Sequence, residues 1–300
     1  MLTVSHLRKE YATTVAVDDV SIAVQRKEIF GLLGPNGAGK TTTIRAILNI
    51  IEPDNGQILF DGIPYNPGIS NRIGYLPEER GLYKKNKLLH TIQYLASLKG
   101  IPSRTAAIEG RKWLERFNLQ QYIHRKVEEL SKGNQQKVQF IVSILHNPDL
   151  VILDEPFSGL DPVNQILMKD ILMDLRSQGK AIIFSTHQMD QAEKLCDNIC
   201  VINYGRVVLE GDISEIKKRY GKNSLHIEFD GDGSFLKTMP EFQKADVYQN
   251  FAEVQLADHG SVNDILRQLV QRLEIRKFEI MEPSLNSIFI DVVGSKGGKA

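Results

Sequence analysis

The chain reads Gly34-Pro35-Asn36-Gly37-Ala38-Gly39-Lys40-Thr41 directly after an apolar run at residues 28–33 and just before a helix-like run that starts at Thr42. Strand, GxxxxGK[ST] loop and helix in this order form the context in which the motif binds phosphate. The glycines let consecutive backbone N–H groups face an anion, and the positive end of the following helix points at that anion. We expect Lys40 to contact the β- and γ-phosphates of a nucleoside triphosphate and Thr41 to supply a hydroxyl to Mg²⁺. The motif alone still leaves kinases, GTPases and transport ATPases open.

Acidic side chains end a second apolar run. Residues 150–153 read Leu-Val-Ile-Leu, and Asp154 and Glu155 follow them. Both carboxylates lie beside the phosphates if this strand neighbours the loop's strand in a parallel sheet. We then expect Asp154 to help hold Mg²⁺ and Glu155 to polarise the attacking water. The alternative, two acidic residues that merely begin a turn, does not explain their pairing with a phosphate loop.

Two further sites are less specific when taken by themselves. His187 follows the strand-like residues 182–186, where its imidazole can reach a γ-phosphate and the attacking water, although a lone histidine is more often structural. Residues 130–137 begin a predicted helix, and Ser131 and Gly133 offer a hydroxyl and an uncovered backbone to an anion. Spacing alone leaves a simple helix cap as an equal explanation for this second site.

Around these motifs the sequence predicts two domains. Short β-branched runs alternate with helix-period stretches over residues 1–220, which is typical of an α/β phosphate-loop NTPase with a mostly parallel sheet and an N-terminal antiparallel β part. Helical periodicity over about residues 85–147 predicts a helical insertion. Residues 221–293 predict a small α+β domain after a short linker, with strands near 225–229, 247–256 and 276–280 and a helix at 261–273. Residues 294–300 are expected to form a flexible tail.

The composition limits which binding partners and which cell compartment are expected. Lys plus Arg and Asp plus Glu both number 37, so the bulk charge attracts neither nucleic acid nor an anionic membrane. The apolar runs are strand-sized and far below the roughly 20 residues that span a bilayer. No signal-like segment opens the chain, and we expect a cytoplasmic protein. Cys196 and Cys200 lack the second ligand pair of a structural zinc site and are expected to be reduced, partly buried thiols.

In combination, the ordered motifs over about residues 1–220 resemble the nucleotide-binding subunit of ATP-binding cassette (ABC) transporters. In that family residues 34–41 look like the Walker A loop, residues 150–155 like the end of Walker B, and His187 like the switch histidine. Asp161 falls in a segment that resembles the D-loop, and the resemblance implies that Tyr11 stacks on adenine. The signature sequence corresponds to Ser131, Lys132, Gly133, Asn134 and Gln135.

The resemblance also implies an assembly. Two cassettes face each other head to tail, so that the signature of one copy closes on the ATP held by the Walker A loop of the other. ATP binding closes this homodimer or heterodimer, and hydrolysis opens it. The motion passes to multi-span permease subunits, through which the chain would lie on the inner face of the membrane.

Two positions depart from the family pattern. Glu78 stands where a glutamine normally senses Mg²⁺ and couples to the membrane partner; a carboxylate can still ligate the metal but cannot donate an amide hydrogen bond. Lys132 replaces a signature glycine, and an added cation near a triphosphate is electrostatically tolerable. We therefore expect an active ATPase whose metal affinity and coupling differ from the glutamine form.

The ending at residues 282–293, after the small extra domain, resembles export-type cassettes related to bacterial sodium-efflux and drug-efflux ATPases. Export is therefore favoured over import. A cassette ATPase of translation or DNA repair is the alternative, but such proteins usually carry tandem cassettes or long coiled-coil insertions. A GTPase would need a guanine-reading Asn-Lys-x-Asp at a strand end, and a kinase would need an acceptor pocket. The transported substrate does not follow from this chain, because selectivity resides in the membrane subunits.

Overall fold

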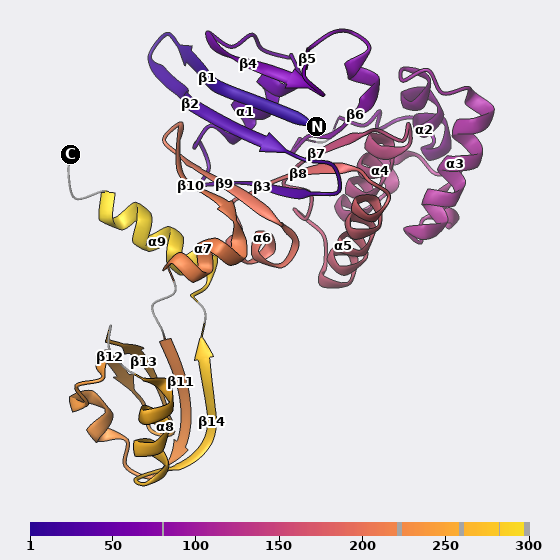
Figure 1. The fold of residues 1–300 in the computed structure, drawn as a ribbon. Coiled ribbons are helices and arrows are strands. Elements are labelled where there is room, and N and C mark those ends of the chain that lie inside the picture. The colour runs from indigo at the N-terminus through magenta and orange to yellow at the C-terminus, as the bar shows by residue number, and fades with distance from the viewer. Residues whose placement is uncertain (80, 221–223, 258–260, 282, 297–300) are drawn as a thin grey trace. The chain divides into compact units, whose positions relative to one another are not determined.

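The computed structural model describes residues 1–300 except 80, 221–223, 258–260, 282 and 297–300. The chain divides into two compact units, Met1–Asp212 and Ile213–Ala300, and each is described by itself (Figure 1). Among the described residues, no helix is both long enough and apolar enough to cross a membrane.

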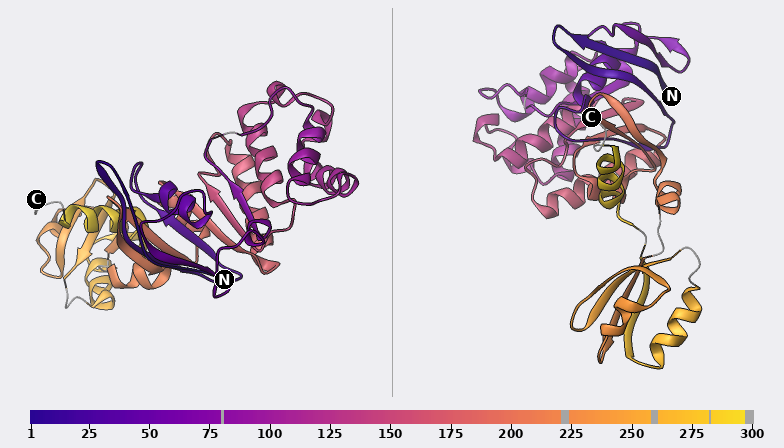
Figure 2. Two further views of the ribbon diagram at one scale, coloured as in Figure 1. Left: turned by 90° about the horizontal axis from the view of Figure 1, so that it is seen from above. Right: turned by 90° about the vertical axis from the view of Figure 1, so that its left-hand side faces the viewer.

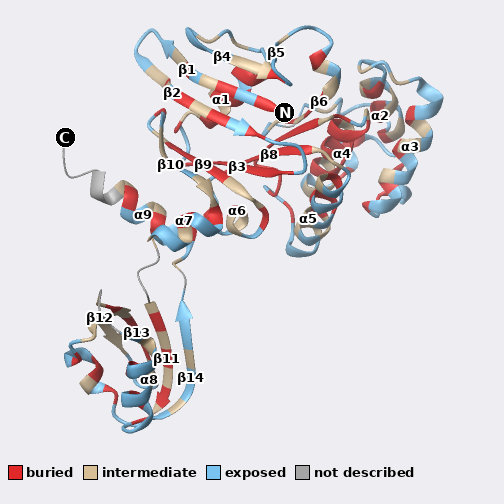
Figure 3. Cartoon of the chain, viewed as in Figure 1, coloured by how far each residue is buried: buried red, intermediate tan, exposed pale blue. Residues whose placement is uncertain are grey.

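A six-stranded sheet forms the centre of the first unit, in the order β10-β9-β3-β8-β7-β6. Strands β9, β3, β8, β7 and β6 run parallel, and β10 pairs antiparallel with β9 at one edge. Every residue of β3, β7 and β8 is buried, and Figure 3 shows these strands as the interior of the unit. Burial on both faces explains why these strands read as unbroken apolar runs. The strands are β3 (Ile29–Leu33), β6 (Ile73–Leu76), β7 (Leu150–Asp154), β8 (Ala181–Thr186), β9 (Asn198–Asn203) and β10 (Arg206–Asp212).

Parallel register brings the ends of the three central strands together. Leu33 pairs with Thr186, and Asp154 pairs with Ser185. The loop after β3, the acidic residues at the end of β7 and the residue after β8 therefore meet at one edge of the sheet, as the sequence predicts.

The second sheet of this unit is antiparallel, in the order β2-β1-β4-β5. Its apolar side chains, among them Val4 and Val20, join Phe30 and Ile183 of the central sheet in one buried cluster. This sheet is the predicted N-terminal antiparallel part. Its strands are β1 (Leu2–Tyr11), β2 (Thr14–Val24), β4 (Asn55–Phe60) and β5 (Ile63–Pro64).

Helices connect the parallel strands and build a separate group. Helices α1 (Lys40–Ile47), α5 (Pro162–Ser177) and α6 (Met189–Leu195) lie between strands in the chain. Helices α2 (Leu88–Ser97), α3 (Ser103–Arg116) and α4 (Lys132–Ile144) contact one another and lie to one side of the sheets (Figure 2, left). The fold class is thus confirmed, including the helical insertion. Short 3₁₀ turns lie at Ile69–Arg72 (η1), Gln120–Tyr122 (η2) and Val127–Glu129 (η3).

The second unit holds an antiparallel sheet in the order β12-β13-β11-β14. One face packs on α8 (Val262–Val270) through a cluster that includes Ile227, Val254, Ile265 and Leu269. Two more helices complete the unit, α7 (Ile213–Tyr220) and α9 (Leu285–Lys296). The remaining elements are β11 (Ser224–Asp230), η4 (Ser234–Thr238), β12 (Phe242–Val247), β13 (Phe251–Leu256) and β14 (Glu274–Met281).

Two expectations about this unit differ from the structure. The sequence placed the boundary after residue 220, whereas α7 groups with the second unit because it contacts α9. The predicted tail at 294–300 overlaps α9, which continues to Lys296; the rest of that tail lies outside the described residues. Leu285, Ile288 and Val292 are buried on α9, so packing of one helical face stabilises a helix that continues into the predicted tail.

Candidate functional site

The predicted loop lines a cavity of about 220 Å³ in the first unit. Its walls come from the β3–α1 loop, from β2, from the segment after β6 and from the end of β7. The lining residues are Ala16, Asn36, Gly37, Ala38, Gly39, Lys40, Thr41, Thr42, Glu78, Asp154 and Glu155.

The loop backbone needs its glycines. Gly39 has φ of 110°, and a Cβ built there would lie 2.4 Å from the carbonyl oxygen of Ala16, so no other residue fits. Gly37 has φ of 79° with nothing within 4 Å of the same built atom, which leaves its backbone open to the cavity. The first intrahelical bond of α1 runs from the Thr43 N–H to the Gly39 oxygen. The amides between them therefore have no carbonyl of the helix to donate to, and they offer a site for an anion.

Lys40 lies inside this loop and is only 6% exposed. Its ammonium group donates to the backbone oxygens of Gly34 at 2.7 Å and Pro35 at 3.0 Å. Burial lowers the pKa of Lys40, while the nearby carboxylates of Glu155, Asp154 and Glu78 oppose that shift. One cation thus faces three carboxylates in the cavity, and a triphosphate would give this ammonium a stronger set of acceptors than the two carbonyls.

Asp154 ends β7 almost completely buried. Burial raises the pKa of its carboxyl group, and hydrogen bonds from the hydroxyls of Ser185 (2.8 Å) and Thr41 (3.2 Å) oppose that shift. A hydroxyl and a carboxylate side by side are hard oxygen donors of the kind Mg²⁺ prefers. No cluster of three or more His, Cys, Asp or Glu side chains that could hold a metal occurs in the described part of the chain. Since Mg²⁺ usually takes one or two protein ligands plus substrate phosphates, this donor set fits it.

Glu155 and His187 form a direct hydrogen bond. The Glu155 Oε1 atom accepts from Nδ1 of His187 at 2.6 Å and from the His187 backbone N–H at 3.0 Å. Its Oε2 atom accepts from the Thr186 hydroxyl at 3.1 Å. Glu155 also has φ of 48°, a left-handed conformation that is uncommon outside glycine and that redirects the chain at the end of β7. The result is a carboxylate fixed from one side at the cavity wall, while His187 remains half exposed.

The signature residues do not line this cavity. Ser131 is the N-cap of α4, and its hydroxyl accepts from the Asn134 N–H at 3.3 Å. Gln135 donates from Nε2 to the Leu130 oxygen at 2.9 Å, which fixes the turn before the helix. Ser131 and Lys132 are exposed. Gly133 lies so close to the backbone of Gly159 that a Cβ built on it would be 3.1 Å from that residue's oxygen. The start of α4 is therefore fixed by its own hydrogen bonds and lies outside the phosphate-loop cavity.

Five other predicted residues also lie outside the cavity lining: Tyr11, Gly34, Pro35, Asp161 and His187. Tyr11 ends β1 and is 47% exposed, with the Lys9 ammonium 5.6 Å from its ring centroid. The neighbouring strand β2 supplies Ala16 to the cavity. Asp161 caps α5 by accepting from the Asn164 N–H at 3.0 Å.

Sequence reasoning missed Ser185 and Thr186. Their hydroxyls bind the carboxylates of Asp154 and Glu155 respectively. The signal was present, because both residues directly precede His187 on a strand predicted to run parallel to β7. Only the register of β8 against β7, with Ser185 opposite Asp154, turns that proximity into hydrogen bonds.

A glycine-rich loop that opens a helix beside the ends of parallel strands, combined with an antiparallel sheet and a helical insertion, defines the nucleotide-binding cassette class of phosphate-loop ATPases. Comparison with known proteins agrees. The model of the ABC transporter family matches residues 17–158, and that of the ATP-binding protein DrrA1-3-like, C-terminal domain, matches residues 211–293.

Individual relatives support the same assignment. An uncharacterized ABC transporter ATP-binding protein of Bacillus subtilis is 47% identical over 98% of this chain and 99% of its own. A fluoroquinolones export ATP-binding protein of Mycobacterium tuberculosis is 33% identical, over 94% of this chain and 89% of its own. A solved ATP-binding subunit of an ABC transporter is 31% identical with a TM-score of 0.69, covering 74% of this chain and 93% of that one. The chain belongs to the ATP-binding proteins of ABC transporters, which hydrolyse ATP to energise membrane transport.

Proposed function

We propose that this chain hydrolyses ATP to drive export of a small molecule through permease subunits that it does not contain. The observation that carries the proposal is the hydrogen bond between His187 and Glu155, the carboxylate of which lines the phosphate-loop cavity. Export is supported by the relative that carries that activity in its name.

The residues take complementary roles in this proposal. The loop amides and Lys40 bind the phosphates, and Thr41 with Asp154 would hold Mg²⁺, which would neutralise phosphate charge. Glu155 orients a water whose oxygen attacks the γ-phosphorus, and it accepts the proton as the bond to the β-phosphate oxygen breaks. His187 fixes the carboxylate through Nδ1. Tyr11, exposed and outside the lining, stacks on the adenine ring.

A second copy, or a related cassette, completes the site. Each copy presents a phosphate loop and, outside the cavity of that loop, an exposed start of α4, and a two-fold axis places the loop of one copy against the helix start of the other. Ser131, Lys132, Gly133, Asn134 and Gln135 then face the partner's ATP, and Asp161 lies at the same interface.

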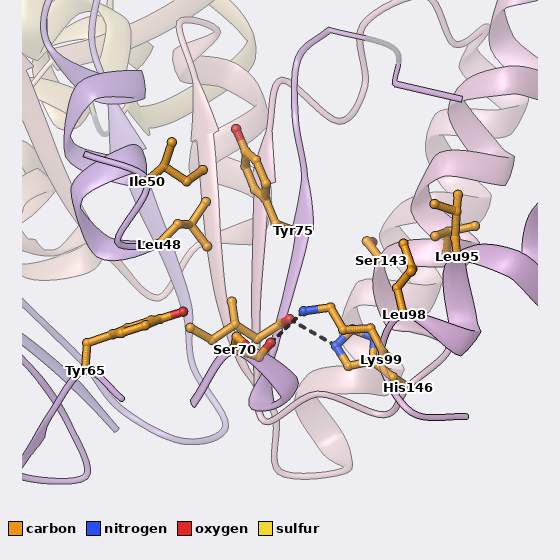
Figure 4. Close-up of a pocket in the computed structure, with 12 residues that line it drawn as sticks. Leu48, Ile50, Tyr65, Ser70, Tyr75, Leu95, Leu98, Lys99, Ser143 and His146 are labelled. Carbon is orange, nitrogen blue, oxygen red and sulfur yellow. Dashed lines mark hydrogen bonds between the residues drawn. The ribbon is translucent and has the colours of Figure 1, made fainter. Parts of the chain in front are cut away.

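A permease contact is supported by a groove of about 340 Å³ between α1, β6, α2 and α4. Figure 4 shows Leu48 and Ile50 on one side and Leu95 and Leu98 on the other. This apolar lining suits a cytoplasmic helix of the permease, bound by its apolar face. Two elements run from the groove to the phosphate cavity: α1 links Leu48 to the loop, and β6 leads to Glu78. Binding of a permease helix in the groove can therefore shift residues of the phosphate cavity, and binding of ATP in the cavity can shift residues of the groove.

Glu155→Gln tests the proposed chemistry. The amide keeps the shape of the side chain but cannot take the proton, so turnover should fall by roughly 10²- to 10⁴-fold. The variant should still bind ATP and accumulate as an ATP-bound dimer on size-exclusion chromatography. Glu210→Gln makes the same change on β10, outside the cavity, and should keep normal turnover. Normal hydrolysis by Glu155→Gln would remove Glu155 from the role of base.

A further inference from the structure

Two segments of the helical insertion are joined by backbone hydrogen bonds, although about forty residues separate them. The Val127 N–H donates to the Asn86 oxygen at 3.0 Å, and the Leu88 N–H donates to the Arg125 oxygen at 2.9 Å. Lys87 and Lys126 form an antiparallel bridge between these bonds. The connection fixes the loop before α2 against the turn before η3.

This connection gathers five exposed cations, here called the basic patch: Lys84, Lys85, Lys87, Arg125 and Lys126. One acidic residue, Glu128, belongs to the same connection: its N–H donates to the Lys84 oxygen at 2.9 Å, and its carboxylate oxygen lies 3.7 Å from the Lys126 ammonium nitrogen. The side chains of Lys84, Lys85 and Lys87 have no ion-pair partner among the described residues. The basic patch thus carries an excess of positive charge, with three unpaired lysines, in a chain that has equal numbers of acidic and basic residues.

The bridge itself is electrostatically unfavourable. Lys87 and Lys126 stand directly opposite each other across the two segments, and like charges in that position repel. An anion bound between them would remove the repulsion. Phosphate groups suit this role, because several ammonium groups and a guanidinium can share their oxygens.

Exposed aromatic side chains border the basic patch. Tyr83 precedes Lys84 in the chain, and its ring packs edge-on against Tyr94 of α2 with centroids 5.3 Å apart. The two tyrosines are 48% and 46% exposed. Amphipathic rings next to lysines are typical of surfaces that enter the headgroup region of a bilayer.

We propose that the basic patch docks on anionic phospholipid headgroups of the membrane that holds the permease. Each cation near such a surface strengthens binding by about fivefold. The contact goes beyond the proposed ATPase function, because it requires neither nucleotide nor permease. It would hold the helical insertion at the bilayer while the dimer opens and closes.

Binding of the purified full-length chain to vesicles tests the proposal. The chain should sediment with vesicles that contain phosphatidylglycerol and not with vesicles of phosphatidylcholine alone, and added salt should weaken the association. The triple variant Lys84→Gln, Lys85→Gln and Lys87→Gln should bind roughly a hundredfold more weakly while its ATP turnover stays normal. The matched control removes three exposed lysines elsewhere, Lys112→Gln, Lys194→Gln and Lys237→Gln, and should keep most of the binding.

Several results would overturn the proposal. Equal binding to both kinds of vesicle would exclude recognition of anionic lipid. An equal loss of vesicle binding in the two triple variants would show that only the net charge of the chain matters. If inorganic phosphate released the chain from vesicles more strongly than chloride did at the same ionic strength, the basic patch would be a site for free phosphate. If the triple variant of Lys84, Lys85 and Lys87 lost its association with the permease in detergent but still bound vesicles normally, the basic patch would instead contact an acidic protein surface. None of these results depends on Glu155, so the ATPase proposal is tested separately.

Discussion

Two helix starts in the first unit have opposite surroundings. Helix α1 begins at a glycine, Gly39, which has no side chain to cap it, and a lysine and three carboxylates surround its open amides. Helix α4 begins at Ser131, whose own hydroxyl accepts from the first turn, and its start faces solvent. The start of α1 thus opens into the phosphate-loop cavity, whereas the start of α4 lies outside that cavity.

Charge explains why the two starts differ. The cavity at α1 has three carboxylates around one buried ammonium group, that of Lys40, so a bound cation would offset the excess of negative charge. The start of α4 carries an added positive charge, Lys132, and no acidic residue in its first turn. A triphosphate bound at the start of α1 would present negative charge to the positively charged start of α4 in a second copy. A head-to-tail dimer requires this charge complementarity.

Of the changes at the two helix starts, removal of the buried Lys40 ammonium group is expected to have the largest effect. Lys40→Ala leaves three carboxylates facing the phosphates without compensation, so ATP turnover should fall by roughly a thousandfold and nucleotide binding should weaken. A filter-binding assay with labelled ATP and a phosphate-release assay measure the two effects. Lys180→Ala is the matched control, because Lys180 also donates to a backbone oxygen, that of Asn147, away from the cavity. Wild-type turnover by Lys40→Ala would mean that α1 is not the ligand site.

A somewhat smaller effect is expected at the start of α4. Aspartate caps helices as well as serine does, so Ser131→Asp should keep the thermal midpoint while it places a carboxylate where the partner's phosphates would lie. Repulsion of several kcal/mol should lower turnover by about a hundredfold. Ser261 caps α8 in the same way, accepting from the Asp264 N–H at 3.4 Å, and Ser261→Asp should leave turnover unchanged. Equal turnover in the two variants would reduce Ser131 to a cap.

Mixing the two defective proteins sharpens the comparison. A dimer of one Lys40→Ala copy and one Ser131→Asp copy contains one site with an intact loop and an intact signature. An equal mixture should therefore regain roughly a quarter of wild-type turnover when the two sites act independently. No recovery on mixing would contradict a site shared between copies.

Much of the fold followed from local patterns. The central strands were predicted because burial on both faces leaves unbroken apolar runs, and the phosphate loop was predicted because its glycines and lysine have few other uses in that order. Asp154, Glu155 and His187 were placed at strand ends, where a parallel sheet brings them together. Strand period and strand direction were sufficient for these inferences.

Other features depend on contacts that no local pattern encodes. The hydrogen bond between Ser185 and Asp154 needs the register of two strands, and the left-handed backbone of Glu155 has no signal in the local sequence. Helix α9 passes through Gly294, a residue disfavoured inside helices, because Ile288 and Val292 of the same helix are buried. The basic patch was hidden for the same reason, since its two segments are joined only in the folded chain.

The smallest effect on basal activity, and the most specific one, is expected from Glu78→Gln. Glu78 lines the cavity and lies two residues beyond β6, whose Ile73 and Tyr75 line the apolar groove. An amide there removes one of three negative charges and adds a hydrogen-bond donor, so basal turnover should stay within about twofold while stimulation by the permease changes. Turnover with and without the permease in proteoliposomes separates these quantities. Glu79→Gln, the neighbouring residue outside the cavity lining, is the control and should change neither. Loss of basal turnover in Glu78→Gln would instead make Glu78 a metal ligand, and the cavity at α1 would then need all three of its carboxylates for chemistry.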